Sequence, residues 1–201
     1  MTTTDGGRGW VGRIGVGCDY QFAGSRWVVG AFGDYDFMGL RGNNSMSEVF
    51  TFGGGAGVTP LTASMKQTGA WYAGARVGYL VNPSFLTYVS GGFTGTRFKE
   101  GPEFSTLTAA TDGFSYPGAF NVNGWFLGGG VDYAMDILPI KGLYWRNEYR
   151  FSTYQGFTGN EFNVATGALT ANSQNIKSYT QTVTTSLVWK FNWAQPVVAR
   201  Y

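Results

Sequence analysis

Apolar and polar residues alternate with a period of two along most of this chain, which is the pattern of β-strands whose two faces meet different surroundings. In residues 10–22, for example, Ile14 and Val16 fall on one face, whereas Arg13 and Asp19 fall on the other. The pattern predicts seven strands, over residues 10–22, 27–37, 70–81, 85–98, 124–136, 143–151 and 179–191. The fourth of these carries apolar residues on both faces.

The connections between these strands alternate between short and long. Short ones near residues 23–25, 82–84 and 138–141 contain Gly, Asn or Pro, which are typical of tight turns. Long ones run roughly over residues 39–64, 99–121 and 155–178. Connections of this length without regular structure are unusual in a compact soluble domain. They are expected of the extracellular loops of outer-membrane barrels, whose periplasmic turns are short.

The apolar face carries aromatic residues near both of its ends. A gap of 8–10 residues separates the two aromatics within most strands. At about 3.3 Å per residue and a tilt of about 40°, it spans on the order of 20–25 Å, which matches the apolar band between two aromatic girdles. A membrane barrel turns this face outward, whereas a soluble lipocalin-like barrel, the alternative, buries it. The predicted girdle consists of Trp10, Tyr20, Trp27, Tyr35, Trp71, Tyr79, Trp125, Tyr133, Trp145, Tyr179, Trp189 and Phe191.

The opposite face collects charges of both signs, together with glycines that leave room for long Arg side chains. We interpret these charges as a network of lumenal salt bridges in a barrel too narrow to be an open channel. The acidic pairs Asp34/Asp36 and Asp132/Asp136 could instead indicate metal binding or acid–base work. The predicted lumenal charge network consists of Arg13, Asp19, Asp34, Asp36, Arg76, Asp132, Arg146, Glu148, Arg150 and Lys190.

The predicted fold class is all-β, an antiparallel up-and-down transmembrane β-barrel that forms one domain over residues 1–201. Single-chain bacterial barrels have an even number of strands and keep both termini in the periplasm. Hydrocarbon also does not tolerate unpaired strand edges. We therefore expect eight strands in the intact protein, with a signal peptide and one strand upstream of this sequence. On this expectation residues 1–9 are the remnant of an extracellular loop, and residues 194–201 are a C-terminal tail.

The segments WVVGAFGDYDF, ARVGYLVNPSFLTYVSGG and QTVTTSLVWKFNW resemble the small alphaproteobacterial outer-membrane barrels of the porin-family or surface-antigen type. The resemblance covers residues 10–193. It implies an OmpA-like eight-stranded barrel, location in the cell outer membrane, insertion by the barrel-assembly machinery, and at most slight pore activity. Such barrels usually end with the aromatic residue of the last strand, a role that either Phe191 or the terminal Tyr201 takes here.

Composition excludes several kinds of chemistry. The chain has no histidine, on which outer-membrane proteases and lipases rely, so we expect no catalytic residues and no enzyme activity. A net charge of +2 is too small to indicate a nucleic-acid partner. The single cysteine, Cys18, falls on the apolar face. The glycine-rich segment Gly53–Gly57 lacks the Lys and Ser/Thr of a phosphate-binding loop and indicates a surface loop. We expect no cofactor and no metal.

These observations favour a structural function: an integral barrel that supports envelope integrity and surface properties, with outer-membrane lipid and the assembly machinery as partners. One alternative is a narrow, low-conductance porin for ions or small solutes. Another is a binding protein whose long loops capture a surface partner.

Overall fold

The computed structural model of the protein describes residues 6–52, 55–105, 114–115, 119–135, 142–163 and 166–191. The strands are β1 (Gly7–Arg8), β2 (Val11–Gln21), β3 (Trp27–Phe52), β4 (Gly55–Asn82), β5 (Phe85–Ser105), β6 (Phe114–Ser115), β7 (Phe120–Ala134), β8 (Leu143–Tyr154), β9 (Phe157–Asn163), β10 (Leu169–Ile176) and β11 (Tyr179–Trp189). None of the described residues belongs to a helix long and apolar enough to cross a membrane.

Seven of these strands form one antiparallel up-and-down sheet, in the order β2-β3-β4-β5-β7-β8-β11. Each of the seven overlaps a strand that the alternation predicts, although β3, β4 and β5 are much longer, so the prediction of an all-β antiparallel fold is confirmed. Strand β1 also pairs with β3 and keeps the register of β2, because Arg8 lies opposite Arg41 and Val11 opposite Met38. Residues 7–8, which the sequence predicts to be part of a loop remnant, therefore form a strand that pairs with β3.

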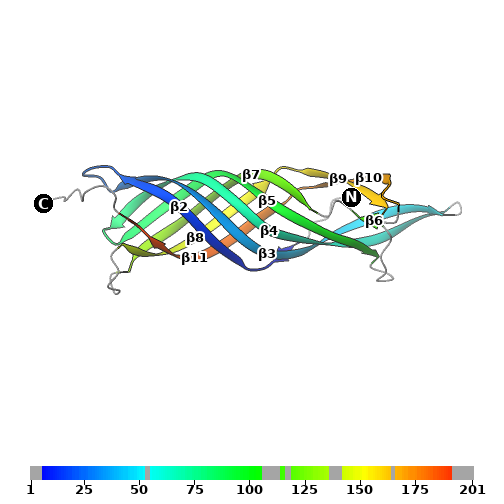
Figure 1. Cartoon of the computed structure of the whole chain (residues 1–201), viewed down its shortest axis with the longest axis horizontal. Coiled ribbons are helices and arrows are strands. Elements are labelled where there is room, and N and C mark those ends of the chain that lie inside the picture. Colours follow the sequence, from blue (N-terminus) through cyan, green and yellow to red (C-terminus); the bar gives the residue numbers. More distant parts are fainter. Residues whose placement is uncertain are drawn as a thin grey trace.

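The molecule is elongated, and its strands tilt relative to its long axis (Figure 1). Tight turns join β2 to β3 and β4 to β5 at one end, which we call the turn end. In the first turn Gly24 adopts a φ of 68°, which glycine accepts without steric cost. In the second, the side chain of Asn82 accepts a 2.9 Å hydrogen bond from the backbone N–H of Ser84. The β3–β4 and β9–β10 hairpins lie at the opposite end, which we call the hairpin end.

The long connections contain more regular structure than the sequence predicts. Strands β3 and β4 continue through most of residues 39–64 as a paired hairpin that reaches Phe52 opposite Gly55. Strand β5 extends to Ser105, and residues 155–178 contain β9 and β10. The expectation of connections without regular structure is therefore wrong for these segments. Such two-stranded ribbons are held together by backbone hydrogen bonds between antiparallel partners. These bonds do not require alternating apolar and polar side chains, so the sequence pattern does not predict the ribbons.

The sheet curls until its two edge strands meet. Side chains from strands far apart in the sheet contact each other; Oε1 of Gln67 on β4, for example, accepts a 2.9 Å hydrogen bond from Thr180 on β11. At the edges, Nη1 of Arg13 on β2 donates a 3.2 Å hydrogen bond to Oγ1 of Thr184 on β11. Among the described residues, no backbone ladder joins β2 to β11. The strands thus form a curled sheet with a seam between β2 and β11.

The curl gives the sheet a buried inner face and an exposed outer face. Strand β8 illustrates the division, because Glu148 and Arg150 are buried whereas Trp145 and Tyr149 are exposed. The charged side chains therefore lie inside together with part of the apolar side chains, and many large apolar side chains lie outside. This is the reverse of the usual distribution in water-soluble proteins.

Candidate functional site

The ten charged residues that the sequence assigns to one face of the strands all form ion pairs with one another at inner-facing positions. They fall into two clusters, named here by the end that each approaches. The hairpin-side cluster consists of Arg13, Asp34, Asp36, Glu148 and Arg150. The turn-side cluster consists of Asp19, Arg76, Asp132, Arg146 and Lys190.

The hairpin-side cluster is organised around Glu148. Arg13 binds both carboxylate oxygens of Asp36 through Nε and Nη2, at 2.6 and 2.8 Å, and its Nη1 lies 2.7 Å from Oε1 of Glu148. Arg150 binds Asp34 through Nη2 at 2.5 Å and contacts Glu148 through Nε. Glu148 therefore holds together two guanidinium groups, from β2 and β8, that would repel each other without it. Two-point contact between Arg and a carboxylate is among the strongest charge-assisted hydrogen bonds.

The guanidinium of Arg150 is almost completely buried, and aromatic rings surround it. Its Cζ lies 5.0, 4.8 and 5.2 Å from the ring centroids of Phe32, Tyr72 and Phe126. Cation–π attraction of this kind offsets part of the desolvation penalty of a buried charge. The contact also accounts for Phe32, which interrupts the polar pattern on its face of β3.

The turn-side cluster repeats the two-point arrangement twice. Arg146 binds both oxygens of Asp132 at 2.7 and 2.8 Å, and Arg76 binds both oxygens of Asp19 at 2.8 and 2.5 Å. Lys190 Nζ lies 3.0 Å from Asp132 and 3.5 Å from Asp19, so it joins the two pairs. Because Asp19 belongs to β2 and Lys190 directly follows β11, this ion pair crosses the seam.

Tyr88 connects the two clusters. Its hydroxyl donates a 2.6 Å hydrogen bond to Oε2 of Glu148 in the hairpin-side cluster. Its ring centroid lies 5.0 Å from Cζ of Arg76 and 5.4 Å from Cζ of Arg146 in the turn-side cluster. The hairpin-side cluster has one carboxylate in excess and the turn-side cluster one cation in excess, so the linked set is formally neutral.

Glycines on β7 leave the space that these side chains occupy. A Cβ atom at Gly130 would lie 2.6 Å from the Tyr88 hydroxyl oxygen. At Gly128 it would lie 3.0 Å from Cγ of Arg150 and 2.9 Å from Oγ of Ser90. The inner face thus has room for Tyr88 of β5 and Arg150 of β8 because β7 carries no side chain at these two positions.

Apolar side chains pack beside the turn-side cluster and between the hairpin-side cluster and the hairpin end. Between the hairpin-side cluster and the hairpin end, the amide nitrogen of Gln67 donates to Thr96 at 2.9 Å and to Tyr154 at 3.3 Å. At the turn end the packed group is Val28, Leu80, Leu86 and Tyr88. At the hairpin end it is Met65, Phe98, Phe120, Val122, Tyr154 and Phe157. Side chains therefore fill the inner face at several levels along its length.

The outer face carries the aromatic residues that the sequence assigns to a girdle. All are exposed, from 38% for Tyr79 to 65% for Trp10. Polar side chains on this face pair with each other across strands: Thr185 Oγ1 donates a 2.6 Å hydrogen bond to Oδ1 of Asn147. Cys18 is exposed on the same face. The twelve aromatics are Trp10, Tyr20, Trp27, Tyr35, Trp71, Tyr79, Trp125, Tyr133, Trp145, Tyr179, Trp189 and Phe191.

The acidic pairs are arranged as ion-pair partners. Asp34 binds Arg150 and Asp36 binds Arg13, so each carboxylate has its own guanidinium. Asp136 lies outside the described residues, as do residues 53–54 of the glycine-rich segment and the tail at 194–201. Among the described residues, no group of three or more His, Cys, Asp or Glu side chains is placed to hold a metal ion.

Two residues that are central to the inner face, Tyr88 and Gln67, are not among the residues predicted from the sequence. Tyr88 lies on the one strand whose faces are both partly apolar, and only its shared parity with Ser90 and Thr94 indicates that it points inward. Gln67 bonds to residues 29, 87 and 113 positions away in the sequence. Such contacts depend on the register of the strands, which the sequence does not specify.

No family model matches the sequence, and no curated protein matches it. The role of the inner and outer faces therefore has to be inferred from their geometry and chemistry.

Proposed function

We propose that this protein is an integral β-barrel of a bacterial outer membrane, of the small alphaproteobacterial type that its sequence resembles. Its role on this proposal is structural, in envelope integrity and surface properties, without catalysis. The observation that carries the proposal is the distribution of side chains between the two faces. Val16, Phe93 and Leu187 are 81%, 72% and 66% exposed on the outer face, whereas Asp36 and Asp132 are 0% exposed inside.

A continuous apolar surface of this extent is unfavourable in water and favourable in hydrocarbon. Aromatic side chains near both ends of the surface suit the two membrane–water interfaces, where amphipathic rings are enriched. The ion pairs inside meet the opposite requirement, because a charge away from water needs a partner. Both faces thus favour lipid outside and packed side chains inside.

The filled inner face favours a structural role over transport. Buried ion pairs occupy its middle, and apolar groups pack toward each end. An eight-stranded barrel has an interior just wide enough for its own side chains. We therefore expect no steady conductance from the folded protein.

We further propose that the complete barrel has an eighth strand, which inserts between β2 and β11 and replaces the side-chain contacts that join them across the seam. Inward-facing positions of β2 next to the seam, at Gly15, Gly17 and Asp19, are exposed, as is typical of an open edge. Strand β2 pairs with β3 and β11 with β8, so each leaves one edge unpaired among the described residues. A strand between them satisfies both edges, as hydrocarbon requires.

Hydrogen–deuterium exchange tests the eighth strand. In the 201-residue chain folded in detergent micelles, we expect the amides of β2 and β11 to exchange much faster than those of β4 and β5. In the protein isolated from native membranes, we expect all four strands to be protected alike. Strong protection of β2 and β11 in the 201-residue chain would instead mean that the two strands pair directly, without a further strand.

Reconstitution tests the function itself. The protein is expected to fold into phosphatidylcholine vesicles, to resist protease there, and to migrate differently on gels with and without heating. Planar bilayers should then show no steady current. Reproducible single-channel steps that change in Arg146→Ala or Glu148→Ala would favour the narrow porin, because both side chains belong to the inner network.

A further inference from the structure

A row of four cationic residues crosses the sheet at the hairpin end. Arg8 of β1 lies directly opposite Arg41 of β3. Arg41 in turn lies opposite Lys66 of β4, and Lys66 lies opposite Lys99 of β5. Directly opposed residues project to the same face of a sheet. At about 4.8 Å between strands, this basic row extends over about 14 Å.

The basic row lies on the outer face. Its members alternate with residues that point inward: Leu40, beside Arg41, packs against the inner cluster around Met38. Gln67, beside Lys66, bonds to Thr180 inside. Successive strand residues point to opposite faces, so the row points outward. Its members on β1, β3 and β5 are accordingly exposed.

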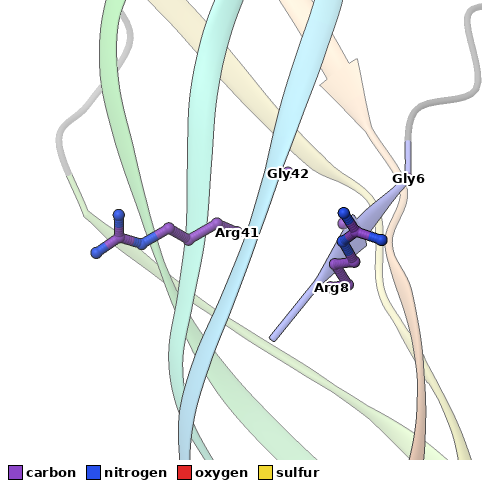
Figure 2. A pocket seen from close by; sticks show the side chains of 5 residues that line it. Gly6, Arg8, Arg41 and Gly42 are labelled. Atoms are coloured by element: carbon purple, nitrogen blue, oxygen red, sulfur yellow. The ribbon is translucent and has the colours of Figure 1, made fainter. Parts of the chain in front are cut away.

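Among the described side chains, none compensates these charges. Like charges directly opposite on neighbouring strands destabilise a sheet, and the row contains three such pairs in succession. Among the described side chains, no ion pair joins a member of the row to a carboxylate, although all ten inner charges are paired. Figure 2 shows the guanidinium groups of Arg8 and Arg41 pointing away from each other, beside an open hollow that Gly6, Gly7 and Gly42 also line.

The row lies immediately beyond the apolar band. Trp10 follows Arg8 by two residues on the same face, which is about 7 Å along a strand. On β5 the exposed Phe93 is followed on the same face by Arg97 and Lys99, both exposed. No described strand residue on the outer face at the turn end is cationic. On the described strands, the outward-facing positive charge is therefore concentrated on one rim, at the level where lipid headgroups would meet the barrel, while the exposed Arg26 lies in the β2–β3 turn at the other end.

We infer that the basic row binds the phosphate groups of anionic lipid headgroups in the leaflet around the hairpin end. This inference rests on the proposed membrane function and extends it, because it gives the barrel a lipid preference and a fixed orientation. Arg and Lys are the side chains suited to phosphate, through charge-assisted hydrogen bonds. The row directly adjoins the apolar band. A lipid whose acyl chains cover that band places its headgroup beside the row, where the negative phosphate reduces the repulsion between the four cations.

Energy transfer from tryptophan to labelled lipid tests the inference. The protein is reconstituted in phosphatidylcholine vesicles that contain a trace of pyrene-labelled phosphatidylglycerol or, separately, pyrene-labelled phosphatidylcholine. We expect stronger transfer to the anionic probe, and a loss of this preference at high NaCl because salt screens exposed charges. The double variant Arg41→Gln/Lys66→Gln should reduce the preference at least about fivefold, given the usual contribution of a cation near an anionic membrane surface.

A matched control and a charge reversal sharpen the test. Arg26→Gln/Lys177→Gln removes the same charge from two exposed cations that stand apart from the row and from each other, and should reduce the preference far less than Arg41→Gln/Lys66→Gln does. Lys66→Glu places a carboxylate between two cations of the row. It should abolish the preference while raising the urea concentration needed for unfolding, because it relieves repulsion. This variant keeps the test decisive if the glutamine variant folds poorly.

The outcomes separate the two proposals. A protein that does not insert into phosphatidylcholine vesicles contradicts the proposed function and this inference with it. Insertion with equal transfer to both probes, or a preference that Arg41→Gln/Lys66→Gln leaves intact, contradicts the inference alone. Release of the anionic probe by inorganic phosphate, at an ionic strength where chloride has no effect, would assign the row to a free anion and overturn the assignment to lipid.

Discussion

Tyr88 donates a 2.6 Å hydrogen bond to Oε2 of Glu148, and this contact links the two charge clusters of the inner face. The other oxygen of Glu148 already binds Arg13. The Tyr88 ring lies against Arg76 and Arg146, so one side chain touches an anion of one cluster and two cations of the other. The clusters are therefore expected to respond to mutation as a single network.

Removing the Tyr88 hydroxyl is predicted to destabilise the protein. Tyr88→Phe deletes a hydrogen bond to a buried carboxylate, which typically contributes about 1.5–3 kcal/mol. Urea unfolding in vesicles, followed by tryptophan fluorescence, measures the change. Tyr149→Phe is the matched control, because its hydroxyl is bonded to Gln181 on the exposed outer face at 3.0 Å. Equal effects of the two substitutions would contradict a special role for Tyr88.

Glu148→Gln is predicted to be the more damaging change. It leaves Arg13 and Arg150 facing each other without the carboxylate between them, and breaking a buried ion pair typically costs about 3–5 kcal/mol. Adding Arg150→Met together with Asp34→Asn should recover part of the loss, since Met can fill the space among the aromatic rings and no partner of Arg150 is left as an unpaired charge. A triple variant less stable than Glu148→Gln alone would show that unpaired buried charge does not control stability here.

A methyl group at Gly130 is predicted to disturb the same network through packing. The added Cβ would lie 2.8 Å from Cζ of Tyr88 and 2.6 Å from the backbone oxygen of Asn147. Overpacking of this kind costs about 1–3 kcal/mol. Gly129→Ala is the control, since its nearest neighbour, the Tyr88 backbone oxygen, lies at 3.4 Å. Unfolding midpoints that fall equally in both variants would point to backbone effects instead of contact with Tyr88.

Introducing a charged side chain on the outer face tests whether that face contacts lipid or water. Val89 is 63% exposed and lies opposite Val77 and Gly129 in the middle of the apolar band. In a membrane barrel, Val89→Arg should cost about 2–4 kcal/mol, whereas Gln181→Arg, close to Tyr179 at the aromatic level, should cost about 1 kcal/mol or less. If the outer face met water, both substitutions would leave the unfolding free energy nearly unchanged.

Alternation was sufficient to predict seven strands of the sheet and, for all of them but β5, the division of residues between two faces. It identifies Arg13 and Asp36 as neighbours on one face because period two depends only on the local chain. It does not identify which charges meet. The contact of Arg13 with Glu148 joins strands at different places in the sheet and depends on its register and curl.

The structural features that the sequence does not predict have the same origin. The hairpin of β3 and β4 beyond residue 39 is held by backbone pairing, which leaves no pattern in the side chains. Tyr88 is hidden because Leu86 makes its face of β5 look apolar. The basic row is visible only once the register places Arg41 opposite both Arg8 and Lys66. Lone cations scattered along the sequence give no indication of it.

The central claim, that the apolar outer face meets lipid chains, is tested most directly by tryptophan quenching. Six of the seven tryptophans, Trp10, Trp27, Trp71, Trp125, Trp145 and Trp189, are exposed on the outer face. The measurement compares fluorescence in phosphatidylcholine bilayers with and without bromine on the acyl chains, and then with acrylamide in the water. We predict strong quenching by the brominated chains and weak quenching by acrylamide. Strong quenching by acrylamide with no effect of bromine would contradict the account.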